Sequence, residues 1–399
     1  MGKLGKIDSV RNWNKSVDGV PHRENIGKIL GRLLTSLLFM YVTPLRSGVD
    51  HDALQKKSPV LFIGNFLSAS LGIRGVCEDL AAQLKQSGWA VITASNKPGR
   101  LARLLDMITT VLKNRHRYSI ANVEVYSGWA FFWAALVSRI LHSIHKPYIL
   151  TLHGGNLPTF AKRWPRPMTR LLRSAAGVTT PSRYLYEAMI SYRADIHLLP
   201  NSLDLSCYRF TLRERPQPSL VWLRSFHTIY NPQLAPRTVA RLSNDFPNIH
   251  LTMVGPDRGD QSLAATRQVA TMLGVGNRID VVGGVPKAEV PNVLSKADIF
   301  LNTTNFDNTP VSVLEAMACG LVIVSTNVGG IPHLLENEYD ALLVPPNDPV
   351  MMAAAVRRVL TEPDLAKRLS RNARTKVEQF GWSAILPKWE KLFTTTCAR

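Results

Sequence analysis

Two carboxylates lie eight residues apart in the stretch FDNTPVSVLEAMACGLVIVSTNVGG, residues 306–330. Asp307 belongs to a polar turn that contains a proline, whereas Glu315 lies among apolar neighbours in a helical pattern. A carboxylate can accept hydrogen bonds from hydroxyl groups, and each such charge-assisted bond contributes about 1.5–3 kcal/mol. Two acids at this spacing suit a ligand that carries two pairs of hydroxyls. The alternative is structural, with Asp307 as a helix cap and Glu315 as a partly buried acid.

The segments around the two acids indicate how the fold positions them. The runs DIFLNTT (298–304) and LVIVST (321–326) predict two buried strands, with a helix between them and Gly329-Gly330 after the second. At the carboxyl edge of a parallel sheet, loops and helix N-termini converge, and ligands bind there. The free N–H groups at a helix start can also bind an anion or hydroxyls. The sequence therefore predicts a ligand site at this edge.

Alternating strand and helix patterns extend over most of the chain. Apolar runs such as VLFIGNF (60–66) and WAVITAS (89–95) alternate with amphipathic patterns such as VCEDLAAQLKQSG (76–88). This alternation predicts parallel sheets with helices on both faces. It pauses at RERPQPS (213–219), a charged stretch with prolines that suits a linker, and then restarts. The chain of 399 residues is therefore expected to form two successive doubly wound α/β domains.

The positive charge of the chain is concentrated in its first half. Residues 1–200 hold 27 Lys and Arg against 11 Asp and Glu, whereas residues 201–399 hold 21 against 18. A basic surface fits either nucleic acid or an anionic membrane. No nucleic-acid-binding motif is present, and the basic runs lack an aromatic stacking platform. No nucleic-acid partner is therefore expected.

Cysteine usage and hydropathy indicate the compartment. The four cysteines are far apart and form no CxxC pair, which indicates a reducing compartment without a disulfide or zinc framework. The first 25 residues are polar and charged, so a cleaved signal peptide is not expected. The segments 26–46 and 101–119 are amphipathic with cations at their ends, and each suits either a membrane interface or docking onto a core.

Several short motifs, taken in order, resemble the family 4 glycosyltransferases, which have the GT-B architecture. The family pattern of two acids separated by seven residues, then AxAxGxPVV and a Gly-Gly turn, reads here as Asp307, Glu315 and AMACGLVIVSTNVGG. The supporting motifs are HGG (153–155), TPS (180–182), PNSLDL (200–205), LR (223–224), VGP (254–256) and VVGGV (281–285). The resemblance covers roughly residues 59–385.

The resemblance implies a fold and a domain organisation. The expected fold is α/β, with two doubly wound Rossmann-like domains facing across a cleft that closes to complete the site. The expected parts are a basic, amphipathic leader at 1–50, an acceptor-side domain at 51–205, a nucleotide-sugar-binding domain at 206–380, and a terminal helix at 381–399 that crosses back to the first domain.

The resemblance also implies roles for individual residues. Glu315 would hold the ribose hydroxyls, Asp307 would face the donor sugar, and Arg224 would neutralise the diphosphate. His153 would contact the donor sugar beside the bond that breaks. Gly72 would let the backbone approach the phosphate and the reacting centre, and the backbone around Val285 and Lys287 would meet the nucleobase. The remaining donor-side positions are Asn308, Thr309, Pro310 and Val311 in the turn.

The chain departs from the family pattern at two positions. The first acid is Asp rather than Glu. The stretch LRSFHTIYNP (223–232) also lacks the lysine that normally follows the arginine. A missing positive charge beside a diphosphate removes ~4 kcal/mol of Coulomb stabilisation at intermediate dielectric. His227, the Gly72 backbone or a basic group of the other domain would have to replace it.

The expected reaction is the transfer of a hexosyl unit from a nucleotide-diphosphate sugar to an acceptor hydroxyl, with retention of anomeric configuration. The main task of the protein would be to stabilise negative charge on the leaving diphosphate. No DxD-like cluster is present, so no metal ion is expected, and no cofactor beyond the donor substrate. The alternatives are a catalytically impaired scaffold with the same fold and a nucleotide-sugar epimerase.

The acceptor side is predicted from the basic stretch FAKRWPRPMTRLLRS (160–174). Cations with an interleaved Trp suit an anionic headgroup plane, although a solvated basic surface is the alternative. The expected enzyme is cytoplasmic and peripheral on the inner face of the cytoplasmic membrane. Its expected acceptor is a lipid-linked or membrane-associated glycan in polysaccharide or glycoconjugate synthesis. The residues assigned to this surface are Arg115, Arg117, Lys162, Arg163, Trp164, Arg166 and Arg170.

Overall fold

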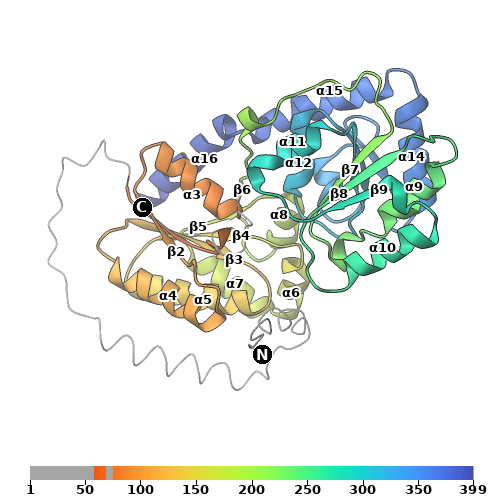
Figure 1. The fold of residues 1–399 in the computed structure, drawn as a ribbon. Coiled ribbons are helices and arrows are strands. Elements are labelled where there is room, and N and C mark those ends of the chain that lie inside the picture. Colours follow the sequence, from red (N-terminus) through yellow and green to blue (C-terminus); the bar gives the residue numbers. More distant parts are fainter. Residues whose placement is uncertain (1–57, 69–74, 399) are drawn as a thin grey trace, which may run out of the picture. The chain divides into compact units, whose positions relative to one another are not determined.

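The computed structural model describes residues 58–68 and 75–398. In this part of the chain the strands form two six-stranded sheets, each covered by helices on both faces (Figure 1). The chain divides into two compact units. Unit 1 runs to Thr179 and also contains Tyr192–Ile196 and the chain from Glu390 onward, and unit 2 contains Thr180–Ser191 and His197–Trp389. The domain limits expected from the sequence stay predictions.

The first sheet is built from short strands that are mostly apolar. Its order is β2-β1-β3-β4-β5-β6, and parallel pairing joins β1 to β2 and β3, β3 to β4, and β4 to β5. The order reverses between β1 and β3, as in a doubly wound fold. The strands are β1 (Val60–Ile63), β2 (Val91–Ala94), β3 (Ile120–Val125), β4 (Tyr148–Leu152), β5 (Gly177–Thr180) and β6 (Ile196–Leu198).

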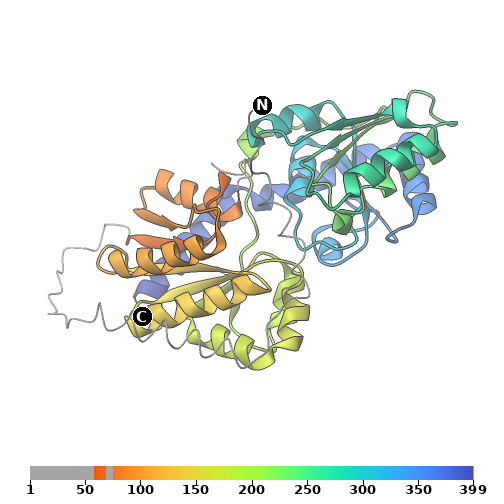
Figure 2. The same ribbon diagram turned by 60° about the horizontal axis from the view of Figure 1, so that its bottom comes forward.

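The helices that follow these strands cover both faces of the first sheet. Figures 1 and 2 show α4, α5 and α7 together on one face, and α3 lies on the other. The end of helix α16 (Trp382–Cys397) also packs within unit 1, where the centroid of the Phe393 ring lies 6.0 Å from that of Phe62 and 5.8 Å from that of Trp89. The helices of this part are α3 (Val76–Gln86), α4 (Arg100–Lys113), α5 (Trp129–Ser143), α6 (Leu157–Arg163), α7 (Pro165–Ser174) and α8 (Arg183–Met189).

The second sheet repeats this plan. Its order is β12-β11-β10-β7-β8-β9, every described pairing is parallel, and the order reverses between β7 and β10. The strands are β7 (Ser219–Leu223), β8 (His250–Val254), β9 (Ile279–Val282), β10 (Ile299–Asn302), β11 (Val322–Thr326) and β12 (Leu342–Val344). The two parallel sheets with their helices confirm the predicted fold class of two Rossmann-like domains.

Alternating side chains of the second sheet form two cores. In β7, Leu220 and Trp222 pack with α9 and α14, whereas Val221 packs with α11 and α12 on the opposite face. Both faces are therefore apolar, as a sheet between two helix layers requires. The helices are α9 (Leu234–Leu242), α10 (Ser262–Met272), α11 (Val290–Ser295), α12 (Val311–Cys319), α13 (Ile331–Leu334), α14 (Pro349–Thr361), α15 (Leu365–Val377) and α16 (Trp382–Cys397).

The stretch 213–219, predicted as a linker, is anchored in unit 2 instead. Arg213 is buried, its Nε lies 2.8 Å from Asp298 Oδ1, and its Nη2 donates to the Ala297 carbonyl at 2.9 Å. A buried guanidinium needs such partners, so this residue holds the start of unit 2 against the turn before β10. The arginine that suggested an exposed linker instead anchors this stretch through its contacts with Asp298 and Ala297.

Some predictions fall outside the described residues. The leader at 1–50, its amphipathic segment 26–46, and Gly72 all lie there. Within residues 58–68 and 75–398, no helix combines the length and apolar character that crossing a bilayer would require. The four cysteines are free thiols, as their spacing predicted.

Candidate active site

The predicted donor residues of unit 2 lie where the strand order reverses. Arg224 directly follows β7, and the loop with Asp307 follows β10, the neighbouring strand. The loops after adjacent parallel strands leave the sheet at the same edge, and the reversal leaves a crevice between them where ligands bind. The topology therefore brings together two residues that are far apart in the sequence.

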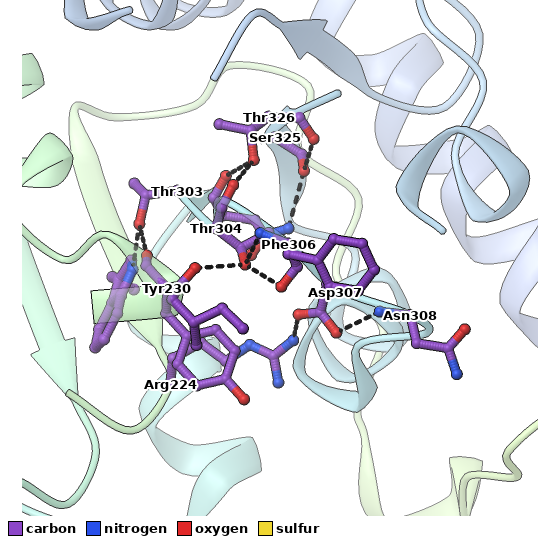
Figure 3. Close-up of polar contacts among 12 residues, drawn as sticks. Arg224, Tyr230, Thr303, Thr304, Phe306, Asp307, Asn308, Ser325 and Thr326 are labelled. Carbon is purple, nitrogen blue, oxygen red and sulfur yellow. Dashed lines mark hydrogen bonds and ion pairs between the residues drawn. The ribbon is translucent and has the colours of Figure 1, made fainter. Parts of the chain in front are cut away.

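Arg224 and Asp307 form an ion pair between Nη2 and Oδ2 (Figure 3). The guanidinium also lies over the Tyr230 ring, 4.7 Å from its centroid. Burial lowers the pKa of Arg224, while the neighbouring Tyr230 and Glu315 act in the opposite direction. Because a guanidinium stays protonated in proteins, this side chain is a fixed cation at the carboxyl edge. A cation held in this way can stabilise an anionic ligand group.

Threonine hydroxyls hold the loop that carries Asp307. Thr304 Oγ1 donates to the Phe306 carbonyl at 2.8 Å, and Thr326 Oγ1 donates to the Thr304 carbonyl at 2.6 Å (Figure 3). Thr303 Oγ1 donates to the Tyr230 carbonyl at 2.7 Å. These bonds connect the loops after β7 and β10 with the end of β11, so they fix the backbone that leads to Asp307.

The Gly329-Gly330 turn packs directly against the Asp307 loop. Gly330 N donates to the Asp307 carbonyl at 2.8 Å. A Cβ at Gly330 would lie 1.9 Å from the Asn308 carbonyl oxygen, and one at Gly329, where φ is +55°, would lie 2.3 Å from the Asp307 carbonyl oxygen. No side chain fits in this space. The glycines therefore allow the acid loop to lie on the turn that follows β11.

Replacing Gly330 with alanine is expected to lower the free energy of unfolding by about 1–3 kcal/mol, because the added methyl group overpacks a fixed loop. Thermal unfolding of the two proteins measures this change. Gly276→Ala is the matched control, since a Cβ at Gly276 meets nothing within 4 Å. Equal melting temperatures for G330A and G276A would show that the Asp307 loop can shift to make room for the methyl group without loss of stability.

Glu315 lies on α12, the helix that follows the Asp307 loop. It is 3% exposed, and its Oε1 accepts a hydrogen bond of 2.8 Å from the Tyr208 hydroxyl. The same oxygen forms an ion pair with Lys287 Nζ. Burial and the Glu315 carboxylate raise the pKa of Tyr208, so its hydroxyl stays protonated and donates. One oxygen of the carboxylate thus contacts both a phenol hydroxyl and an ammonium group.

The residues between the two acids form the turn into α12. The helix begins at Val311, and its N-cap is Pro310 rather than Asp307, so the structural alternative of an Asp307 cap is wrong. Asp307 Oδ1 instead accepts from the Asn308 backbone N–H at 2.9 Å. Asn308, Thr309 and Val311 are half-buried. The turn leaves these backbone groups at the same edge as the ion pair of Arg224.

The segment after β9 contributes Val285 and Lys287. Val285 is half-buried, and Lys287 begins the 3-10 helix η5 (Lys287–Glu289). His227 is a suggested replacement for the missing lysine, and that role stays a prediction. Its Nδ1 accepts from the Ile229 N–H at 3.1 Å, and its Nε2 lies 3.9 Å from Asp260 Oδ2.

In unit 1, His153 belongs to a buried cluster with Glu124 and Tyr126. His153 directly follows β4, and its Nε2 lies 3.1 Å from Glu124 Oε1. The Tyr126 hydroxyl donates to Glu124 Oε2 at 3.2 Å, and its ring stacks on the imidazole with 5.2 Å between centroids. The cluster fixes the orientation of the imidazole. The contact with a donor sugar stays a prediction.

The predicted acceptor-side residues also lie in unit 1. The α6 and α7 cations are exposed, whereas Trp164, half-buried between these helices, packs against Phe132 and Phe160 with centroid distances of 5.8 and 6.4 Å. The tryptophan is thus part of an aromatic cluster. The remaining residues are Lys162 and Arg163 at the end of α6, Arg166 and Arg170 on α7, and Arg115 and Arg117 after α4.

Two family models together match most of the chain. The model for Glycosyltransferase Family 4 matches residues 91–206, and the model for Glycosyl transferases group 1 matches residues 212–376. The chain belongs to the family 4 glycosyltransferases. Across the described residues of this glycosyltransferase, no group of three or more His, Cys, Asp or Glu side chains is placed to hold a metal ion.

Curated proteins that are similar to this glycosyltransferase are themselves named as sugar transferases. A D-inositol 3-phosphate glycosyltransferase from Paenarthrobacter aurescens is 26% identical over 267 residues, which are 63% of this chain and 64% of that protein. A phosphatidylinositol N-acetylglucosaminyltransferase protein from Arabidopsis thaliana is 25% identical over 171 residues, which are 42% of this chain and 37% of that protein. The chain therefore matches less than two thirds of the length of each of these relatives.

Solved structures share the fold of this glycosyltransferase. HepE from Anabaena, solved in complex with UDP and glucose, has a TM-score of 0.69 at 19% identity, over 85% of this chain and 100% of that one. Sucrose-phosphate synthase from Thermosynechococcus elongatus has a TM-score of 0.71 at 18% identity, over 86% of this chain and 99% of that one. These likenesses show the GT-B fold.

Sequence reasoning missed three partners of the glycosyltransferase site. Tyr208, which holds Glu315, comes from the segment between the two sheets, and no motif marks it. Glu124 lies near the end of β3 and Tyr126 directly follows that strand. The available signal was a buried acid in a mostly apolar strand. The structure brings Arg224, Asp307, Lys287 and Glu315 together in unit 2, and it places His153 in unit 1.

Proposed function

We propose that this glycosyltransferase moves a hexosyl unit from a nucleotide-diphosphate sugar to an acceptor hydroxyl, with retention of anomeric configuration. One observation carries the proposal: Arg224 and the acids Asp307 and Glu315 gather at the strand reversal of unit 2. A fixed guanidinium suits a diphosphate, and the two carboxylates suit the hydroxyl pairs of a hexose and a ribose. The UDP and glucose in the complex with HepE support a donor of this class.

The chemical step needs little covalent participation by the protein. The bond between the anomeric carbon and the diphosphate oxygen breaks, and the acceptor oxygen bonds to the same face of that carbon. The acceptor proton passes to the departing diphosphate. Because negative charge grows on the diphosphate as the bond breaks, Arg224 would stabilise the transition state more than the bound substrate, which accelerates the reaction.

A thermal-shift screen tests the donor proposal. UDP, GDP and ADP, each with and without a hexose, should raise the melting temperature according to their affinity for the folded chain. Incubation with the sugar that stabilises the chain should then release the nucleoside diphosphate. Stabilisation without release in the presence of candidate acceptors would favour the alternative of an impaired scaffold, and conversion of the donor to an isomer would favour the epimerase.

Transfer is expected to be independent of metal ions. A cation on the protein would supply the charge that a divalent ion supplies elsewhere, since Arg224 is already placed and charged. Adding EDTA should therefore leave the rate of nucleoside diphosphate release unchanged. Loss of activity in EDTA that manganese restores would contradict this expectation.

We further propose that the acceptor is a lipid-linked or membrane-associated glycan, used in cell-surface polysaccharide or glycoconjugate synthesis at the inner face of the cytoplasmic membrane. The helix layer of α4, α5 and α7 carries exposed cations, and Leu101 and Leu105 of α4 are 78% and 52% exposed beside Arg100. Apolar side chains next to cations suit an anionic membrane surface. The name of the Arabidopsis relative, which contains phosphatidylinositol, supports an acceptor of this kind.

Vesicle flotation tests this surface. The double variant L101D/L105D should weaken binding to anionic vesicles about tenfold or more, because each leucine loses its burial in the bilayer. Met272→Asp is the matched control, since Met272 is 76% exposed on α10 of unit 2 and should not matter. Failure of the unaltered chain to float with anionic vesicles at moderate salt would remove the membrane proposal.

A further inference from the structure

The four charged side chains of the unit 2 site form two ion pairs. Arg224 pairs with Asp307, and Lys287 pairs with Glu315. Each carboxylate that the proposed function assigns to ligand hydroxyls thus already has a cation beside it. Two positive and two negative charges balance, so the site without a ligand has no net excess of cations for a diphosphate.

The two members of the Lys287–Glu315 pair have different surroundings. The Lys287 side chain is 41% exposed, whereas the Glu315 side chain is 4% exposed and keeps its hydrogen bond from Tyr208. An ammonium group on a flexible, partly hydrated stem can leave at little cost in solvation. The carboxylate cannot move in the same way, because α12 and Tyr208 hold it. The lysine is therefore the mobile partner of the pair.

The loop after β7 offers no lysine or arginine beyond Arg224 for a diphosphate. Residues 225–232 contain neither Lys nor Arg, and His227 is held by the Ile229 N–H and faces Asp260. The Tyr208 hydroxyl and Lys287 Nζ both contact Oε1 of Glu315, so ribose hydroxyls that donate to this oxygen would compete with the ammonium group. The cation released by that exchange is Lys287, and it lies next to the ribose, to which the diphosphate is bonded.

We propose that Lys287 is the second diphosphate-binding cation of this site and that it exchanges partners on donor binding. Without donor it neutralises Glu315, and with donor it pairs with the phosphates while the ribose hydroxyls take its place. The inference rests on the proposed function, because it requires the ribose at Glu315. It supplies the positive charge that the segment after Arg224 lacks.

If this exchange occurs, removal of the Lys287 ammonium group should weaken the binding of a nucleoside diphosphate but not that of a nucleoside. This difference separates a loss of phosphate binding from a general loss of structure at the site. A nucleoside must displace Lys287 without offering it phosphates, whereas a nucleoside diphosphate offers both. In Lys287→Met, the Kd for UDP should rise about tenfold or more, as expected when one charge-assisted bond is lost. The Kd for uridine should stay equal or fall, because no ammonium group has to be displaced.

Isothermal titration of UDP and uridine tests the proposal, with GDP and guanosine and with ADP and adenosine titrated in parallel. The ratio of the nucleoside Kd to the diphosphate Kd should fall at least about tenfold in K287M. The double variant K287M/E315Q should show the same fall in this ratio, although it contains no unpaired buried acid at position 315. The single variant E315Q, which keeps Lys287, should have a larger ratio than the double variant. Lys296→Met is the matched control, since Lys296 is an exposed lysine that ends α11.

Three outcomes would overturn the proposal. An unchanged ratio in K287M, or an equal rise of both Kd values, would show that Lys287 does not bind the phosphates. A fall of the same size in K296M would show that any positive charge on this unit suffices. If the unaltered chain bound none of the three nucleoside diphosphates, the proposed function would fail first, and the role of Lys287 would fail with it.

Discussion

Replacing Arg224 with methionine is expected to lower turnover about a thousandfold. Methionine keeps an unbranched side chain over the Tyr230 ring but removes the cation that would face the leaving diphosphate. Loss of one preorganised donor to developing charge typically reduces turnover by about 10²–10³. Here the unpaired Asp307 carboxylate would also repel the diphosphate, so the upper end of that range is expected. The measurement is nucleoside diphosphate release at saturating donor.

A second variant separates catalysis from folding. In R224M, Asp307 is left without its cation, which should also lower the melting temperature. The double variant R224M/D307N removes that unpaired charge, so its melting temperature should recover while its turnover stays low. Turnover within tenfold of the unaltered enzyme in R224M would show that Arg224 has no part in the reaction. Recovery of turnover in the double variant would show that it serves only to pair Asp307.

Replacing Glu315 with alanine is expected to weaken donor binding about 10–100-fold, because the ribose hydroxyls lose a charged acceptor. The buried Tyr208 hydroxyl would also lose its partner, and stability should fall by about 1–3 kcal/mol. Isothermal titration with the nucleoside diphosphate that stabilises the chain measures the first effect, and thermal unfolding measures the second.

Two milder changes show which part of Glu315 matters. Glu315→Gln keeps an oxygen for the Tyr208 hydroxyl, so it should retain most of the stability while losing about tenfold in affinity. Tyr208→Phe removes the same hydrogen bond from the other side and leaves the acid for the ligand. Unaltered affinity and turnover in E315A would end the assignment of Glu315 to the donor.

The sequence predicted the fold well because its signals are local. Short apolar strands that alternate with amphipathic helices dictate a parallel sheet, and the interruption near residue 213 separates two such patterns. The same stretch also makes a contact that no local signal indicates. Arg213 reads as an exposed linker residue, and it became buried because Asp298, 85 positions away in the chain, pairs with it. Composition alone does not report that contact.

The candidate site was predictable where the motif carries the chemistry. The positions of Asp307 and Glu315, and the glycines that admit their loop, follow from one continuous segment. The partners of those acids do not, because Arg224, Lys287 and Tyr208 arrive from separate strands and loops whose convergence depends on strand order. Lys287 is the clearest case. Its backbone was expected to meet the nucleobase, whereas its side chain forms an ion pair with Glu315 on α12.

The threonine bonds behind Asp307 have a thermodynamic consequence. Hydrogen bonds from Thr303, Thr304 and Thr326 fix the backbone of this loop, so the conformational entropy of that loop is lost when the protein folds. A ligand arriving at this edge therefore meets a rigid backbone, and its binding energy is not consumed in ordering the chain. Affinity at this edge should consequently depend on direct contacts and on the exchange of side-chain partners, and little on ordering of the backbone.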